Sequence, residues 1–380
     1  MCDLKSKVFI LAFFGALLIS PAEVRAQDFK TWALNMWNKL MQPDKNLEST
    51  YVFQPFNGWN VSTTYQGRWD GVGLEIPMDI ITTAGTEQGT IHVNLVDNQS
   101  HHLGLRGGYG PLELGFSIAV NKKEKPDRNL SFNWISTRFS LQFYHTLIHD
   151  TAISTAEFPI GSTPTRMPEA ASSASIWRVG GFYIFNHKKF SYPSAYQGKM
   201  VQRRSAGSFL AGGEFHHSNL TLDKSKSFGS LNLNLNGYST YKFSLGGGYS
   251  FNWVIYHRDA ASIKEIHDLR NLTLNITAIP LLTIVNEMKM THETNTGEEK
   301  FQVHGGIQPN FLGRVGLCYA FGHFYINCSF DFNYHRFQGK ELEQKSLRPY
   351  LEEGADAIYR FKVLGYLANW TGGVQLHYRF

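Results

Sequence analysis

The sequence predicts an all-β fold: a transmembrane antiparallel β-barrel of about twelve strands (roughly ten to fourteen), preceded by a short N-terminal amphipathic helix. Three observations predict it: an N-terminal segment typical of a secretory signal, repeated two-residue alternation of apolar and polar side chains, and a final strand that ends in an aromatic residue. The composition agrees, because aromatic residues make up 14% of the chain, charged residues only 18%, and there are 35 glycines. Such a chain favours many strands with tight turns over a helical protein.

Residues 1–26 have the features of a cleaved signal peptide. Lys5 and Lys7 precede an apolar run from Val8 to Ile19, and a small residue, Ala26, ends the segment. A helix formed by the apolar run would be about 18 Å long, too short for a bilayer core of about 30 Å. We therefore expect cleavage after Ala26 and export of the chain, rather than a single membrane anchor.

Residues 27–47 are predicted to lie in the periplasm and to be largely helical. Between Asp28 and Met41, apolar side chains recur at helical spacing: Phe29, Trp32, Ala33, Met36, Trp37 and Leu40. Two interpretations stay open. The helix lies in the membrane interface or plugs the barrel, since two tryptophans share its apolar face, or it packs on the periplasmic rim.

Residues 48–380 are predicted to form the barrel, because the periodicity changes to that of a strand. Residues 59–69 show the pattern, in which an apolar and aromatic face alternates with a polar one: Trp59, Val61, Thr63, Tyr65, Gly67 and Trp69 against Asn60, Ser62, Thr64, Gln66 and Arg68. A soluble sandwich with one wet face alternates in the same way. Segments of about ten residues, aromatic residues at their ends and a polar face suited to a wet lumen favour a membrane barrel.

The C-terminal segment gives the most specific signal. Alternate residues share an aromatic and apolar face up to the last residue of the sequence: Trp370, Val374, Leu376, Tyr378 and Phe380. A final amphipathic strand of this kind resembles the signal by which the outer-membrane assembly machinery recognises its clients. We therefore expect that machinery and outer-membrane lipid as partners, and the outer membrane as the location.

Connections are predicted from polar stretches and turn residues. Tyr256 to Leu269 and Glu287 to Lys300 are among the long polar stretches expected as extracellular loops. Gly322–His323 and Tyr366 to Asn369 are expected as short periplasmic turns.

Two cysteines flank the Gly322–His323 turn, which suggests a disulfide in an oxidising compartment. The alternation argues against one, because it directs Cys318 into the lumen and Cys328 toward lipid. Side chains on opposite faces of a sheet cannot meet disulfide geometry. We predict two free thiols.

Four stretches carry a family resemblance: Phe185 to Gly213, Gly104 to Val120, Thr137 to Tyr144 and Glu48 to Phe56. They resemble an uncharacterised group of outer-membrane proteins from Bacteroidetes, catalogued as domain of unknown function 4421. The resemblance implies a barrel in the outer membrane. It implies no activity, because that family has none assigned.

Candidate site residues are few. Arg203 and Arg204, followed by Ser205, form either an inward cluster that binds an anionic solute or lipopolysaccharide, or a loop at the headgroup boundary. Arg314 is a third candidate for an anion site in the lumen. Glu214 and His216 share a strand face, as a base and its orienting carboxylate would, and a polar network in the lumen accounts equally for both.

Other chemistry is not indicated. The formal charge of +5 is mild and scattered, so the sequence does not predict a nucleic-acid binder. None of the motifs for zinc, phosphate or dinucleotide binding occurs, and no cofactor, metal site or catalytic residue is expected. A barrel of about twelve strands fits a narrow channel or transporter for a small solute, which we favour. The alternatives are a lipid-modifying or hydrolytic enzyme and a structural or adhesive barrel with a filled lumen.

Overall fold

The computed structural model describes most of the predicted barrel region, with short gaps: residues 47–54, 58–82, 85–96, 100–120, 125–157, 165–166, 170–222, 235–259, 263–294, 297–339, 342–344 and 358–380, together with Thr31 and Asn35. The predicted signal segment and, apart from those two residues, the predicted helix from Asp28 to Met41 lie outside this set, so both stay predictions. Within the part that is described, no helix is long and apolar enough to cross a membrane.

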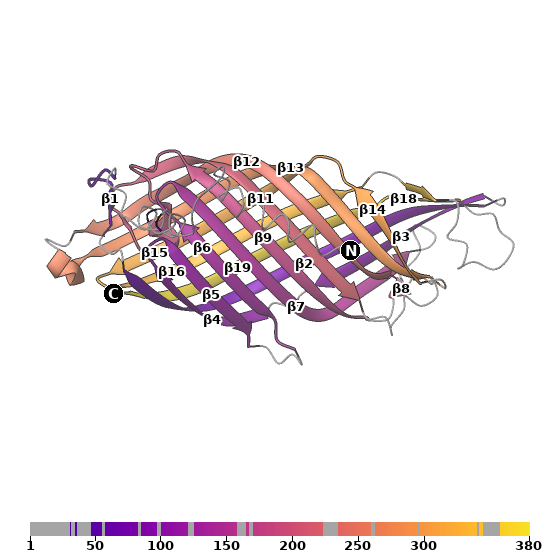
Figure 1. Cartoon of the computed structure of the whole chain (residues 1–380), viewed down its shortest axis with the longest axis horizontal. Coiled ribbons are helices and arrows are strands. Elements are labelled where there is room, and N and C mark those ends of the chain that lie inside the picture. The colour runs from indigo at the N-terminus through magenta and orange to yellow at the C-terminus, as the bar shows by residue number, and fades with distance from the viewer. Residues whose placement is uncertain are drawn as a thin grey trace. The chain divides into compact units, whose positions relative to one another are not determined.

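The strands close into one antiparallel barrel (Figure 1). Several segments are consecutive pieces of one barrel strand, such as β3 with β4, and the barrel has twelve strands in all, as predicted. The segments are β2 (Trp59–Thr82), β3 (Gly85–Val96), β4 (Ser100–Tyr109), β5 (Leu112–Ala119), β6 (Arg128–Ile135), β7 (Phe139–Glu157), β8 (Thr165–Arg166), β9 (Ala170–Ile184), β11 (Ala206–Leu222), β12 (Leu235–Arg258), β13 (Arg270–Thr294), β14 (Gly297–His304), β15 (Gln308–Phe321), β16 (Phe324–Gln338), β17 (Leu342–Gln344), β18 (Ile358–Phe361) and β19 (Leu364–Arg379).

The barrel closes where β19 pairs with β2, in a register that runs from Leu364 opposite Glu75 to Arg379 opposite Asn60. The backbone N–H of Phe380 donates to the carbonyl of Trp59, with 2.9 Å between the heavy atoms. The start of β2 and the end of β19 therefore lie at the same end of the barrel. We call this the proximal end and the opposite one the distal end.

Three predicted connections differ from the structure. The β12–β13 connection, which contains the 3₁₀ helix η2 (Ile263–Asp268), lies at the proximal end, where the N–H of Gly322 donates to the carbonyl of Leu269. It therefore lies at the same end as the predicted periplasmic turns, and its prediction as an extracellular loop was wrong. The length and polarity of a loop do not show at which end of the barrel it lies. Residues 366–369 are part of β19 rather than a turn, and most of residues 287–300 belong to the β13–β14 hairpin.

The two faces of the wall follow the predicted alternation. Along β2, the polar side chains from Asn60 to Arg68 are buried inside the barrel, whereas Trp59, Val61 and Tyr65 are exposed outside. The cysteines also follow the predicted register: Cys318 is buried, Cys328 is exposed, and both thiols are free. Every second residue therefore faces a polar lumen, and the residues between them present an apolar outer surface.

Outward aromatic side chains gather at the proximal rim. Neighbouring strands place their rings about 5 Å apart, as for Trp59 and Tyr109, Phe209 and Tyr249, and Phe324 and Tyr378. Aromatic side chains are the residues that membrane barrels place at the lipid–water interface.

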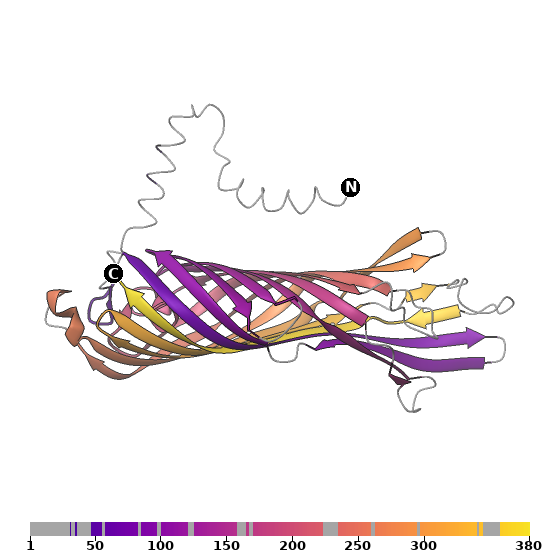
Figure 2. The same ribbon diagram turned by 90° about the horizontal axis from the view of Figure 1, so that it is seen from below.

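The strands are longer than a bilayer requires. β2 and β12 have 24 residues each and β13 has 25, whereas a tilted membrane strand needs about 9–11. Their distal parts form hairpins, β2 with β3 and β13 with β14, that project beyond the rest of the barrel (Figure 2). The predicted strand length of about ten residues is therefore too short, because it leaves out these distal hairpins.

Candidate functional site in the barrel lumen

The connection between β9 and β11 folds into the proximal end of the lumen. We call residues 186–205 the plug. It contains a short helix, α3 (Tyr192–Tyr196), and the two-residue strand β10 (Val201–Gln202). The Ser191 hydroxyl accepts a hydrogen bond from the N–H of Ser194, and Pro193 lies in the first turn of α3, where its missing N–H costs nothing.

Side chains from across the barrel hold the plug. Asn252 of β12 donates to the carbonyl of Ser191 at 2.8 Å, and Arg314 of β15 donates to the hydroxyl of Tyr192 at 2.9 Å. Further hydrogen bonds join the plug to β5, β13, β16 and β19: Lys199 to the carbonyl of Leu112, Asn271 to that of Gln202, Tyr196 to Asn275, Asn327 to the carbonyl of Ala195, and Arg379 to that of Gly198. Because these strands lie on different sides of the barrel, the plug crosses the lumen.

One side of the plug is apolar. Phe190 and Tyr192 pack with Ile184, Ile279 and Leu281 in a buried cluster. Burial raises the pKa of the Tyr192 hydroxyl, against the opposing effect of the Arg314 cation. Burial also lowers the pKa of Lys199 to about 8, although the carboxylate of Glu113 opposes that shift. The plug therefore packs through apolar side chains on one side and forms polar contacts with the opposite wall.

The segment that precedes β2 fixes the plug at the proximal opening. Its strand β1 (Val52–Phe53) pairs with β10, and the backbone N–H of Arg203 donates to the carbonyl of Tyr51 at 2.7 Å. The N–H of Glu48 donates to the carbonyl of Lys188 at 3.0 Å. Two of the stretches that carry the family resemblance, residues 48–56 and 185–213, thus meet in space.

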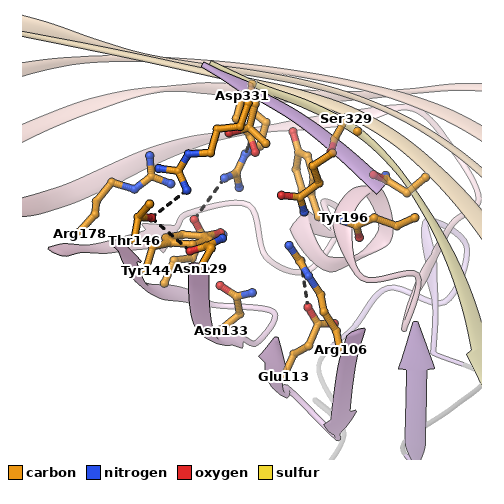
Figure 3. A pocket seen from close by; sticks show the side chains of 18 of the residues that line it. Arg106, Glu113, Asn129, Asn133, Tyr144, Thr146, Arg178, Tyr196, Ser329 and Asp331 are labelled. Carbon is orange, nitrogen blue, oxygen red and sulfur yellow. Dashed lines mark hydrogen bonds and ion pairs between the residues drawn. The ribbon is translucent and has the colours of Figure 1, made fainter. Parts of the chain in front are cut away.

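A polar cavity of about 90 Å³ lies directly beyond the plug (Figure 3). Tyr196 and Gln197 of the plug form part of its wall, together with residues of β2, β4 to β7, β9, β15, β16 and β19. Its charged lining consists of four arginines and two carboxylates: Arg68, Arg106, Arg178, Arg314, Glu113 and Asp331. The cavity is therefore rich in cationic groups.

Arg314 and Arg68 are held firmly in the wall of this cavity. Arg314 forms an ion pair with Asp331 through Nε, and its guanidinium lies 4.8 Å from the ring centre of Tyr196. Arg68 donates to the hydroxyl of Thr146 at 2.8 Å.

Arg178 and Arg106 have longer ionic contacts. The Nε of Arg178 lies 3.4 Å from the carboxylate of Glu214, and its guanidinium stacks 4.6 Å from the ring centre of Tyr144. The Nη1 of Arg106 lies 3.4 Å from the carboxylate of Glu113. Arg178 and Arg106 lie on opposite sides of the cavity (Figure 3).

The three arginines singled out from the sequence separate in the structure. Arg314 lines the cavity. Arg203 and Arg204 lie instead at the proximal surface, where Arg203 pairs with Asp259 at 2.8 Å and Arg204 lies over the ring of Tyr51. Arg68, Arg106 and Arg178 were missed, because they lie on strands far apart in sequence and meet only when the barrel closes. Their inward parity in the alternation is the one signal that indicates them.

A polar layer lies farther along the lumen, distal to the cavity. Glu214 lies 3.6 Å from His335 and accepts a hydrogen bond from Asn333 at 3.4 Å, and the rings of His335 and His216 are 5.1 Å apart. Ser205 and Ser208 do not face this layer, since their hydroxyls accept hydrogen bonds from the N–H groups of Val254 and Asn186. No group of three potential metal ligands occurs in the described segments.

An apolar layer follows at the distal side of these residues. Phe337, Val303 and Met288 are almost completely buried. Their side chains surround Gly339 and Gly365, where an added methyl group would lie 2.5 Å from Val303 and 3.3 Å from Met288, respectively. Large apolar side chains of β13, β14 and β16 thus pack on the lumen side at this level.

The tail residues predicted as an assembly signal lie where the alternation placed them. Val374, Leu376 and Phe380 are exposed on the outer face of β19, and the ring of Tyr378 lies 4.9 Å from that of Phe380. Gln375, His377 and Arg379 are buried on the lumen side.

Comparison with known proteins identifies the family. The model of a family described as a domain of unknown function (DUF4421) matches residues 76–361. The chain belongs to the DUF4421 family. The match includes the plug and most of the barrel, and it confirms the resemblance found in residues 104–120, 137–144 and 185–213. No curated protein matches this DUF4421 chain.

Solved structures similar to this DUF4421 barrel include an outer membrane protease and a toluene transporter. The outer membrane protease OmpT from Escherichia coli has 11% identity and a TM-score of 0.45, over 85% of this chain and 97% of that one. A Pseudomonas aeruginosa FadL homologue has 10% identity and a TM-score of 0.20, over 85% and 91%. The toluene transporter TodX from P. putida has 7% identity and a TM-score of 0.16, over 83% and 90%.

Proposed function

We propose that this protein is an integral outer-membrane β-barrel that forms a narrow channel for a small solute, closed by the plug and opened when the plug shifts. The observation that carries the proposal is the polar cavity between the plug and the distal part of the lumen. A barrel whose interior served only as packing would have no reason to line that space with arginines, amides and hydroxyls. Outer-membrane lipid and the assembly machinery are the partners that follow from this location.

The outer surface supports the membrane location. Apolar residues alternate outward along the strands, and aromatic rings gather at the proximal rim. Val374, on the outer face of β19, is 46% exposed. Val374→Arg should therefore destabilise the folded barrel in lipid by about 2–4 kcal/mol if the residue lies near the bilayer midplane. Val374→Leu is the control and should fold normally, and equal stability of both variants in a urea titration in lipid vesicles would contradict the membrane location.

The plug supports gating. Most of its contacts to the opposite wall are hydrogen bonds from side-chain amides and arginines, and water can replace such bonds. Each amide bond contributes only about 0.5–1.5 kcal/mol to stability, and each arginine bond about 1.5–3 kcal/mol. Displacement of the plug toward the proximal opening would expose the cavity to the periplasm. The β1–β10 pairing would hold the displaced segment near the opening.

A second candidate function, a structural barrel with a filled lumen, is favoured by the distal apolar layer. Phe337, Met288 and Val303 are buried on the lumen side at that level, as packing side chains of a filled lumen would be. The hydrolytic alternative has less support, because the hydroxyl of Ser244, the cross-strand neighbour of Glu214, is hydrogen-bonded to the hydroxyl of Thr283 at 2.8 Å rather than to a histidine.

Single-channel conductance in planar bilayers tests the proposal. The wild type is compared with a variant whose residues 190–200 are replaced by a glycine–serine linker of equal length, and with Phe337→Ala. We expect brief, rare openings of the wild type and frequent openings of the linker variant. Absence of conductance from the linker variant, both alone and combined with Phe337→Ala, would exclude a channel and support the filled barrel.

A further inference from the structure

We propose that the cavity beyond the plug is a binding site for a small oxyanion, held between Arg178 and Arg106. The ligand class is that of a phosphate or a short carboxylate, which present the same charged oxygens to a guanidinium. The inference rests on the proposed function in one respect: it names the class of solute that the channel would admit.

The charges of the cavity lining favour an anion. Four arginines and two carboxylates face the space, and Glu214 behind Arg178 adds one further carboxylate. An arginine keeps its charge at any pH that the protein meets, so the excess of positive charge cannot be removed by loss of a proton. A lining with more arginines than carboxylates therefore favours an anion over a neutral or cationic solute.

The four arginines differ in the donors that they leave available. Arg314 uses all three of its side-chain nitrogens: Nε bonds to Asp331, Nη1 to Tyr192, and Nη2 to Gln142 at 3.4 Å. Arg178 and Arg106 each have a single ionic contact of 3.4 Å, longer than the 2.7–2.9 Å of a strong charged hydrogen bond. Their guanidinium groups therefore have the donors that a ligand needs.

The position of these two side chains suits a ligand between them. Both are largely buried, with 16% of the Arg178 side chain and 14% of the Arg106 side chain exposed, so the nitrogens that remain accessible face the cavity. The ring of Tyr144 supports the guanidinium of Arg178 from one face and fixes the plane of its donors.

The size of the cavity limits the ligand. A cavity needs roughly 10–15 Å³ to hold one water molecule, so about 90 Å³ holds several waters or one small anion. A nucleotide or an oligosaccharide does not fit this space. A phosphate or a carboxylate of two or three carbons does.

Isothermal titration calorimetry of the refolded full chain in detergent micelles tests the site. Inorganic phosphate and acetate are the two probes, and chloride at equal ionic strength is the reference anion. We expect saturable binding of phosphate, acetate or both. Arg178→Gln and Arg106→Gln should each weaken it about tenfold or more, since hydrogen bonds to charged groups are the strong ones. Arg178→Lys keeps the charge and loses the planar fork, so we expect a smaller loss.

Arg204→Gln is the matched control, because Arg204 is exposed at the proximal surface and lies outside the cavity lining. Its binding should equal that of the wild type. Failure of the wild type to bind either probe, or equal loss in Arg204→Gln and Arg178→Gln, would overturn the site and make the arginines a structural charge network. If the glutamine variants do not fold, the wild-type titration and Arg178→Lys decide the question. Binding is measured without a bilayer, so its outcome is independent of conductance.

Discussion

The lumen contains two packed levels that differ in chemistry. The plug at the proximal end is held on most sides by hydrogen bonds with Asn252, Asn271, Asn275, Asn327 and Arg379, whereas the distal layer consists of large apolar side chains around Phe337. Hydrogen bonds can be exchanged for bonds to water, but an apolar layer loses its contacts outright when it opens. The plug also contributes Phe190 and Tyr192 to a buried apolar cluster, so the two levels differ in their share of polar contacts, and we expect the plug to be the level that moves.

The largest effect that tests this comparison is expected at Phe337. Phe337→Ala removes a fully buried ring from the distal layer, and such a change typically destabilises a protein by about 3–5 kcal/mol. Urea-induced unfolding in lipid vesicles, followed by tryptophan fluorescence, measures the loss. Phe185→Ala is the control, because Phe185 is exposed beside the plug. A loss at Phe337 no larger than at Phe185 would show that the distal layer does not hold the barrel together.

A smaller effect is expected at the polar contacts of the plug. Asn252 donates to Ser191, Ser194 and Gln202 and accepts from Asn275, so Asn252→Ala removes four buried hydrogen bonds. We expect a loss of about 1–3 kcal/mol in the same assay, together with more frequent channel openings. Asn219→Ala, at an exposed strand position, should change neither property. Openings in Phe337→Ala but not in Asn252→Ala would reverse the comparison and make the distal layer the gate.

The titration of Lys199, a residue of the plug, makes the stability of the protein depend on pH and so tests the contribution of the plug. Its pKa in the folded protein, about 8, lies below the ordinary value of 10.5, so the folded state disfavours the charged amine. The resulting cost is fully present below pH 8 and disappears as the pH rises from 8 to 10.5. Relative to Lys199→Met, the wild type should gain roughly 2–3 kcal/mol of stability over that range. A constant difference between the two proteins in urea titrations at pH 7, 8, 9 and 10 would show that the amine is solvated.

The smallest effect is expected at the cysteines, which belong to neither packed level. Cys318 faces the lumen and Cys328 the outer surface, so no disulfide can join them. A non-reducing peptide map should contain both residues as free thiols, and unfolding midpoints should be equal with and without reductant. A Cys318–Cys328 bond would contradict the register of β15 and β16, from which the inward direction of Arg314 also follows.

The wall of the barrel could be predicted from the sequence because alternate residues of a strand face opposite sides of the sheet, so a short stretch of sequence is enough to identify both faces. Alternation from Trp59 to Arg68 and from Trp370 to Phe380 gave the inward and outward residues, and the same parity placed Cys318 and Cys328 correctly. The lengths of the strands were not predictable in this way. A criterion based on bilayer thickness counts only the residues needed to cross a bilayer, although β2 and β13 continue as hairpins beyond the rest of the barrel.

The plug and the cavity could not be predicted, for two different reasons. Residues 190–202 have neither strand nor helix periodicity over a useful length, so their fold depends on contacts with β12, β13 and β16 that no local pattern encodes. The cavity depends on distance: Arg68, Arg106, Arg178 and Arg314 are separated by dozens of residues and converge only through closure. Arg203 and Arg204 were chosen as candidates because they are adjacent in sequence. In a loop, adjacent residues need not place their side chains in the same site.

The contact between Arg379 and the plug bears on the order in which the chain assembles. Arg379 belongs to the strand that completes the barrel, and it donates to the carbonyl of Gly198 inside the lumen. The plug lies between β9 and β11, so its strands are made well before β19. Once β19 has paired with β2 the wall is continuous, and the plug can enter only by threading through the proximal rim. If the plug enters the lumen while the sheet is still open, that step is avoided. Arg379 then forms its hydrogen bond to the plug as β19 pairs with β2.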